Sequence, residues 1–137
     1  GHVVKELFEL APVEKSEPQF TVTEHFVFEA AHFIPGASKP ELSRLHGHTH
    51  EVWVTIRGAM QRPFGWVVES SIFRSLVEDE VMALDHCCLN DVMNPTTGEA
   101  VCLYLWDRLR GKLGGRLHEI RLGKAHGVSV SYKGERE

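Results

Sequence analysis

The alternation of apolar and polar residues predicts two long strands followed by two helices. Residues 20–33 and 48–60 are rich in β-branched and aromatic side chains, which favour half-buried strands. Apolar residues then recur from 72 to 84 at about the spacing of one helix face, and a second stripe of this kind runs from 101 to 113. The glycine pair that follows is expected to end the second helix.

The order of the predicted elements indicates an α+β domain. Two short closing strands are predicted at 117–122 and 128–132. The order is then β-β-α-α-β-β, which is typical of an antiparallel four-stranded sheet with both helices on one face. Residues 1–19 are mixed in pattern and are expected to form an N-terminal arm, so residues 20–137 would make a single domain. Other subunits commonly cover the edges of such a sheet, which favours a homo-oligomer.

Three further expectations concern a loop, the start of the second helix and the core. Residues 35–40 contain two prolines and a glycine and are predicted to form a loop. Thr96 and Glu99 have the S/T-x-x-E spacing of a capping box, so they are expected to begin the second helix. Three tryptophans are expected in the core: Trp53, Trp66 and Trp106.

Composition and charge narrow the class of protein. The 137 residues are 42% hydrophobic and 25% charged, and the net charge of −4 comes without a basic stripe, which argues against a nucleic-acid partner. No apolar run approaches the ~20 residues of a membrane-spanning helix. The three cysteines do not form a disulfide framework, since Cys87 and Cys88 are adjacent. Free thiols and the absence of an export signal favour the cytoplasm.

The strongest candidate for chemistry is the motif His46-Gly47-His48. Two histidines at i and i+2 on a strand point to the same face of the sheet. His32, which ends the preceding strand-like run, can supply a third nitrogen. A site of three histidines holds Zn²⁺ and leaves one coordination position open. The alternative is that His46 and His48 are two surface histidines in a turn. A metal site is favoured because His32 and the His46-Gly47-His48 motif both lie at the ends of predicted strands.

Other candidate residues carry weaker signals. Asp85 precedes His86 and can orient its imidazole, although an Asp-His dipeptide alone is more often structural. Cys87 and Cys88 are candidate thiolates, but a cysteine is more often a small buried apolar residue. The remaining histidines outside the N-terminal arm have no selecting spacing and are expected to be solvent-exposed or packing residues: His25, His50, His118 and His126.

Five motifs occur in a fixed order along the chain. They are Phe28-x-Ala30-Ala31-His32, Leu45-His46-Gly47-His48, Gly65-x-Val67-Val68, Leu84-Asp85-His86-x-x-Leu89-Asn90 and Pro95-Thr96-x-x-Glu99. With these motifs the chain resembles, from about residue 26 to 132, the family of 6-pyruvoyltetrahydropterin synthase and 6-carboxytetrahydropterin synthase. The resemblance implies a T-fold domain, trimers that pack into a hexamer, and active sites at subunit interfaces.

The same resemblance assigns roles to individual residues. It implies that Zn²⁺ is the cofactor and that its ligands are the three candidate histidines. It implies that Asp85 and His86 belong to a catalytic proton relay. The candidate substrate-binding residues are Thr97, Glu99 and Lys124.

This chain also departs from the family pattern at two positions of the site. Synthases of the family carry a cysteine shortly before the His-Gly-His motif, whereas the segment here reads Pro40-Glu-Leu-Ser-Arg-Leu45. Some relatives that cleave the pterin side chain use a glutamate in this loop, so Glu41 is a candidate base. Glu41 can equally be a solvated loop carboxylate, and the alternatives of Ser43, a cysteine or no base at all stay open. Lys124 stands where the family has the glutamate that anchors the pterin, and a cation cannot accept N–H bonds.

The resemblance implies a zinc-dependent lyase acting on 7,8-dihydroneopterin triphosphate or a related dihydropterin. Phosphate would be eliminated with rearrangement, or the side chain lost in a retro-aldol-like step. One alternative keeps the zinc but takes a different substrate, such as a sugar phosphate or an anionic heterocycle held by Lys124. Another is a zinc-bearing oligomeric scaffold that binds a ligand without turnover.

Overall fold

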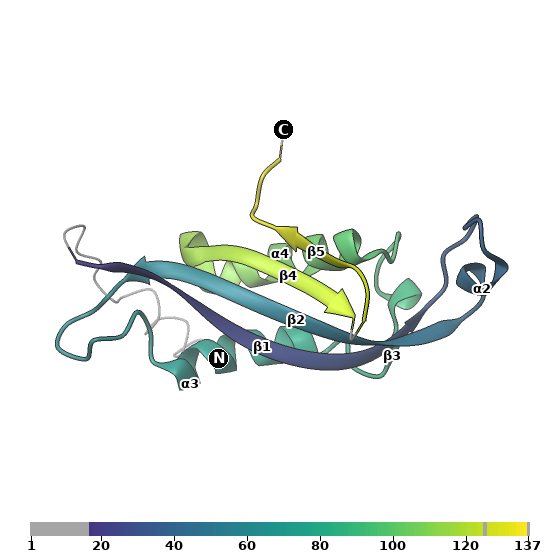
Figure 1. The fold of residues 1–137 in the computed structure, drawn as a ribbon. Helices are drawn as coiled ribbons and strands as arrows, with labels where there is room; N and C mark the ends of the chain where they lie inside the picture. The colour runs from purple at the N-terminus through teal and green to yellow at the C-terminus, as the bar shows by residue number, and fades with distance from the viewer. Residues whose placement is uncertain (1–16, 125, 137) are drawn as a thin grey trace.

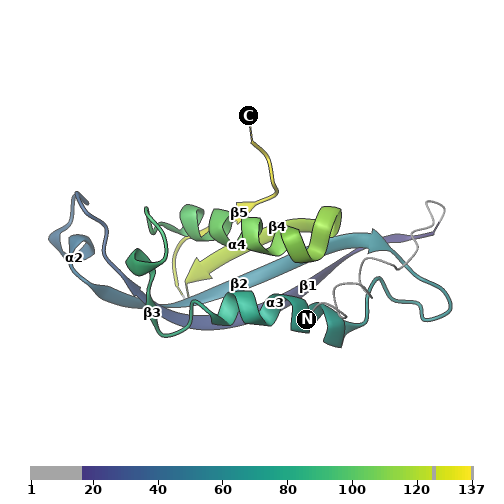
Figure 2. The same ribbon diagram turned by 180° about the vertical axis from the view of Figure 1, so that it is seen from behind.

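A curved sheet and two helices make up the two layers of the molecule. The computed structural model describes residues 17–124 and 126–136. Helices α3 (Ser70–Met82) and α4 (Gly98–Leu113) cover one face of the sheet, and they lie in front of the strands when the molecule is turned by 180° (Figures 1 and 2). The predicted α+β architecture with both helices on one face is therefore confirmed. The arm predicted for residues 1–19 lies outside the described residues up to residue 16.

The sheet is built around one long antiparallel hairpin. Strands β1 (Gln19–His32) and β2 (His46–Ala59) pair over their whole length. Strand β4 (Leu117–Lys124) lies next to β2, and β5 (Ser129–Tyr132) lies next to β4, both antiparallel. The ends of the hairpin strands bring residues distant in sequence together, because His32 pairs with His46.

The predicted count of four strands is wrong by one. Strand β3 (Cys87–Cys88) pairs in parallel with β1 at Ala30 and Ala31, which gives the five-stranded order β3-β1-β2-β4-β5. Two residues are too few to show an alternation of apolar and polar positions. This strand forms because the chain returns to the end of β1 after α3.

The loop after β1 and the start of α4 also differ from expectation. Residues Pro40–Ser43 form the short helix α2 at one end of the sheet, at the edge of the predicted loop (Figure 1). The predicted capping box is wrong by one residue, since Thr97 Oγ1 accepts the Ala100 N–H at 3.2 Å. Thr96 Oγ1 instead donates to the Phe33 carbonyl at 3.4 Å. The side chain of Glu99 is therefore not used in capping.

Alternate strand residues face the helices and form the core. The buried positions of β1, and those of β2 from His50 to Val54, share one parity, and the helices bury their apolar stripes against them. Beyond Val54 the alternation is interrupted, because Thr55 and Ala59 are also buried. Fully burying one such side chain contributes about 1.5–3 kcal/mol. Trp106 lies in the core as expected, whereas Trp66 is 39% exposed and the expectation for it is wrong. The largest fully buried side chains include Phe28, Val52, Val54, Ile56, Phe73, Leu76, Leu105 and Leu109.

The two described helices that cover the sheet are short and amphipathic. Helix α3 has 13 residues and α4 has 16. Within residues 17–124 and 126–136, none of the helices has the length and apolar character needed to cross a membrane.

Candidate functional site

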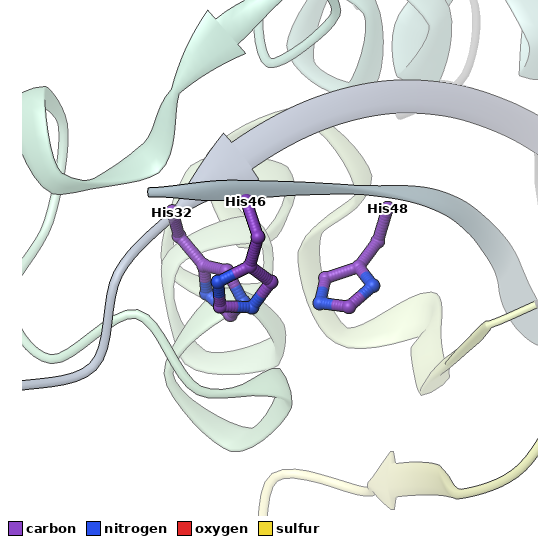
Figure 3. A group of neighbouring side chains, drawn as sticks. All are labelled: His32, His46 and His48. Carbon is purple, nitrogen blue, oxygen red and sulfur yellow. The ribbon is translucent and has the colours of Figure 1, made fainter. Parts of the chain in front are cut away.

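Three histidines converge at the end of the hairpin, on the face that carries the helices. His32 is the last residue of β1, and His46 and His48 lie at the start of β2 with the parity of the buried positions. Their ring centroids are 4.6, 4.8 and 5.1 Å apart. All three side chains hang from the same side of the strands (Figure 3), with candidate ligand nitrogens within 4.8 Å of one another. The predicted cluster is thus assembled by the fold.

Backbone carbonyls set the orientation of two of these rings. His32 Nδ1 donates to the Thr96 carbonyl at 2.9 Å, and His46 Nδ1 donates to the Arg44 carbonyl at 2.8 Å. A carbonyl only accepts, so in a neutral ring the proton sits on Nδ1 and the lone pair on Nε2. The Nε2 atoms of His32, His46 and His48 are buried and have no hydrogen-bond partner among the described residues. Metal-ligating histidines show this arrangement.

Burial keeps two of the three ligand candidates, His32 and His48, in the neutral form that binds a metal. Burial lowers the pKa of His32. It also lowers the pKa of His48 to about 4, with the nearby Lys124 ammonium adding to the effect. A tetrahedral Zn²⁺ with bonds of about 2.0–2.1 Å holds its donors roughly 3.4 Å apart, so small ring rotations suffice to close the cluster. These three residues fit a divalent metal with one position left open.

A cavity of about 190 Å³ adjoins the histidine cluster and contains all three predicted substrate residues. Thr97 and Glu99 line it from the first turn of α4, and Lys124 lines it from the end of β4. His32 lines it as well, so the candidate metal centre and Lys124 share one cavity. The remaining lining residues are Ile34, His50, Thr96, Gly98, Val101, Leu122, Gly123, Val128 and Val130.

His50 is a residue of this cavity that sequence reasoning missed. Its side chain is 3% exposed and its ring stacks on Phe28 with centroids 4.9 Å apart. Neither ring nitrogen has a hydrogen-bond partner among the described residues, and an unsatisfied buried polar group costs about 1–3 kcal/mol. Burial lowers the pKa of His50 to about 4, so the ring is neutral at pH 7. The signal was present, since His50 continues the i, i+2 alternation of His46 and His48.

Asp85 and His86 form a hydrogen-bonded pair at the other edge of β1. Asp85 accepts the Glu29 N–H at 2.8 Å, and His86 Nδ1 donates to Asp85 Oδ2 at 2.7 Å. The Glu29 N–H, and after it the His86 side chain, hold the pKa of Asp85 below its usual range. His86 has a φ of 58°, a left-handed conformation that is uncommon outside glycine and that turns its N–H toward the Glu29 carbonyl.

This pair does not line the cavity that contains Lys124. His86 lines a separate, open cavity of about 430 Å³, together with Glu29, Thr49 and Cys88. Of the predicted cluster, only His48 also borders that second cavity. Within one chain, therefore, the predicted proton relay and the predicted substrate residues line different cavities.

The candidate bases differ in what surrounds them. Burial raises the pKa of Cys87, and its Sγ donates to the Leu84 carbonyl at 3.0 Å, so this residue is a thiol at neutral pH. Glu41 is exposed on α2 and lines neither cavity described above. The Ile34 N–H donates to the Leu42 carbonyl at 2.8 Å, which fastens α2 to the end of β1 near the histidines. Ser43 Oγ donates to the Pro40 carbonyl at 2.9 Å.

Comparisons with known proteins agree with this arrangement. The profile of the 6-pyruvoyl tetrahydropterin synthase family matches residues 21–135. A dihydroneopterin monophosphate aldolase of Pyrococcus furiosus is 31% identical over 109 residues, which cover 77% of this chain and 91% of the relative. A 6-pyruvoyl tetrahydropterin synthase of Caenorhabditis elegans has a similar fold, with a TM-score of 0.75, 21% identity and coverage of 87% and 98%.

A third known protein that resembles this chain has a catalytic glutamate. The structure of a Plasmodium vivax 6-pyruvoyltetrahydropterin synthase, solved as a mutant of a catalytic glutamate, matches with a TM-score of 0.61 at 20% identity and covers 85% of this chain and 99% of that one. The solved structures confirm the T-fold that the resemblance implies. With a profile match over most of its length, the chain belongs to the 6-pyruvoyl tetrahydropterin synthase family.

Proposed function

We propose that this protein is a zinc-dependent lyase acting on a phosphorylated dihydroneopterin or a related dihydropterin. The observation that carries the proposal is the cluster of His32, His46 and His48, in which one candidate ligand atom of each residue lies within 4.8 Å of the others. The Nε2 atom of each ring is buried and has no partner among the described residues. Family membership supports the substrate class. The name of the Pyrococcus furiosus relative, an aldolase, supports cleavage of a carbon–carbon bond.

The chemistry divides between the metal and the protein. Three neutral imidazoles leave Zn²⁺ its full charge, so the bound ion supplies polarisation of a hydroxyl or carbonyl oxygen on the substrate side chain. In a retro-aldol step a base takes the hydroxyl proton, the adjacent carbon–carbon bond breaks, and the electron pair passes to the ring before carbon is protonated. Asp85 orients His86, which holds a proton for such transfers.

The separation of His86 from the Lys124 cavity supports a site shared between chains. His86 is exposed, with 79% of its side chain accessible, and is free to reach another subunit. The family resemblance implies trimers, hexamers and interfacial active sites. We therefore include a homo-oligomer in the proposal, in which the Asp85–His86 pair of one chain serves the histidine cluster of another.

The test is metal analysis followed by incubation with substrate. We expect about one zinc ion per chain, and release of a product from dihydroneopterin monophosphate or triphosphate by the zinc-loaded protein. Chelation should abolish the reaction, and added zinc should restore it. Zinc-loaded protein that neither converts nor binds either compound would overturn the proposal.

Glu41 is the proposed base, and its substitution tests that role separately. Glu41→Gln keeps the size of the side chain but removes the carboxylate, so kcat is expected to fall by about 10²–10⁴ with unchanged zinc content. The catalytic glutamate of the Plasmodium vivax relative supports a residue of this type. Glu78→Gln, an exposed glutamate of α3, is the matched control.

The size of the loss in Glu41→Gln decides whether another residue has to be considered as the base. A loss of less than about threefold in Glu41→Gln would exclude Glu41, because loss of a general base costs far more. In that case Ser43→Ala examines the other polar side chain of α2, whose hydroxyl is exposed.

A further inference from the structure

The cavity beside the histidine cluster contains a cation, Lys124, that forms no ion pair with any described residue. Lys124 lies directly opposite His50 in the pairing of β2 with β4, so both side chains project from the same face of the sheet. Both line the 190 Å³ cavity. Among the described residues, no carboxylate lies within ion-pair distance of Lys124. Toward the described part of the chain, the ammonium group therefore keeps its N–H donors available for a ligand.

His50 adds a second group that needs a ligand. Its ring is almost fully buried, yet neither nitrogen has a partner among the described residues. A neutral imidazole offers one N–H donor and one acceptor. Stacking on Phe28, with the two rings inclined by 16°, fixes the plane of the imidazole, and His50 lines the cavity.

The first turn of α4 supplies a third set of donors. Thr97 accepts the Ala100 N–H through its side chain and the Val101 N–H through its carbonyl. The N–H groups of Gly98 and Glu99 precede these bonds and are left over at the positive end of the helix. Gly98 has no side chain to cover them, and it lines the cavity.

Glu99 is the one acid among the described residues that line this cavity. Glu99 also lines the neighbouring cavity of about 590 Å³, which Arg136 lines too, so this residue lies between the two cavities. Donors thus dominate the part of the small cavity between β2, β4 and the helix.

We propose that His50, Lys124 and the first turn of α4 form a subsite for an oxyanion, a carboxylate or phosphate group of the substrate. The subsite belongs to the proposed active site and rests on that proposal. A carboxylate would accept hydrogen bonds at this position, whereas the Lys124 ammonium only donates them, so the subsite selects a ligand group that accepts hydrogen bonds and carries negative charge. Its volume, several times the ~30 Å³ of a water molecule, accommodates such a group.

The experiment is a titration with inorganic phosphate and with acetate, followed by amide NMR at pH 7. Metal-free and zinc-loaded protein are both titrated, so binding to the metal is separated from binding at the subsite. We expect the amide signals of Gly98, Glu99 and Gly123 to shift with at least one of the two anions. The anion that binds more tightly identifies the substrate group as phosphate or carboxylate.

Matched variants assign the binding to the subsite. Lys124→Met is expected to weaken anion binding about tenfold or more, since it removes a charged donor. Lys133→Met, which removes an exposed lysine that lines neither neighbouring cavity, should leave the affinity unchanged. His50→Phe keeps the stacking on Phe28 and should weaken binding about fivefold through loss of a neutral hydrogen bond.

The subsite and the proposed function fail in different ways. The subsite is overturned if neither anion shifts these amides in either form of the protein, or if Lys124→Met and Lys133→Met bind equally well. Conversion of dihydroneopterin phosphates in that case would leave the proposed function standing. If anions bind in a way that depends on Lys124 but no pterin is converted, the subsite is supported and the proposed pterin substrate is wrong.

Discussion

Replacing His48 by alanine is expected to reduce the zinc content of the protein from about one ion per chain to nearly none. The imidazoles of His32 and His46 would remain, hydrogen-bonded to the backbone carbonyls of Thr96 and Arg44. Loss of a residue that merely orients a ligand costs about 10–100-fold in metal affinity, and loss of a ligand itself costs more. Catalytic activity is expected to disappear with the metal.

The measurement is zinc analysis after dialysis, combined with thermal unfolding. A ligand present at 1,000 times its dissociation constant stabilises the folded state by about 4 kcal/mol, so chelation should lower the melting temperature of the wild type clearly. The same treatment should not change the melting temperature of His48→Ala. His25→Ala is the control, because His25 is a half-exposed histidine of β1 paired with Glu51. Stoichiometric zinc in His48→Ala would disprove the cluster as the metal site.

Asp85→Asn is expected to lower kcat by about 10²–10⁴ while zinc content stays the same. The carboxylate of Asp85 accepts from His86 Nδ1 through one oxygen and from the Glu29 amide through the other, so it fixes the orientation and the tautomer of the ring. An asparagine keeps the shape but has one acceptor oxygen in place of two, so it cannot accept both bonds in this way. Steady-state kinetics on the zinc-loaded variant measure the effect, with Asp79→Asn on the exposed side of α3 as control. Unchanged kcat in Asp85→Asn would remove the pair from the mechanism.

Mixing two inactive variants tests whether the active site is shared between chains. His48→Ala and Asp85→Asn damage different parts of the proposed site. If each site takes its histidine cluster from one chain and its Asp85–His86 pair from another, random co-assembly restores about one quarter of the sites. No recovery of activity in mixed oligomers would place both parts within one chain.

The histidine cluster can be predicted from sequence because it depends on alternation alone. His46 and His48 share one face at any pairing of the strands, and the apolar residues Val52, Val54 and Ile56 identify that face as the buried one. His32 shares the parity of Phe28. That His32 lies opposite His46 depends on the register of the hairpin, which the long connection between the strands does not specify.

Other parts of the site depend on contacts that sequence patterns do not carry. The position of Asp85 is set by the Glu29 amide and by the parallel pairing of β3, a strand of two residues. The importance of His50 follows from its burial without partners, which only packing against Phe28 reveals. Glu99 could be assigned to capping from its spacing, and the structure moves the cap to Thr97.

The hydrogen bond from His32 to the Thr96 carbonyl joins the metal cluster to the segment that starts α4. A metal ion that holds the His32 ring also steadies that segment, and with it the helix turn that borders the small cavity. An occupant of the cavity that orders the same turn favours the metal-bound position of the ring. Thermodynamic linkage makes this effect mutual, so each of the two raises the affinity of the protein for the other by the same factor. Zinc affinity measured with and without a bound anion gives that factor directly.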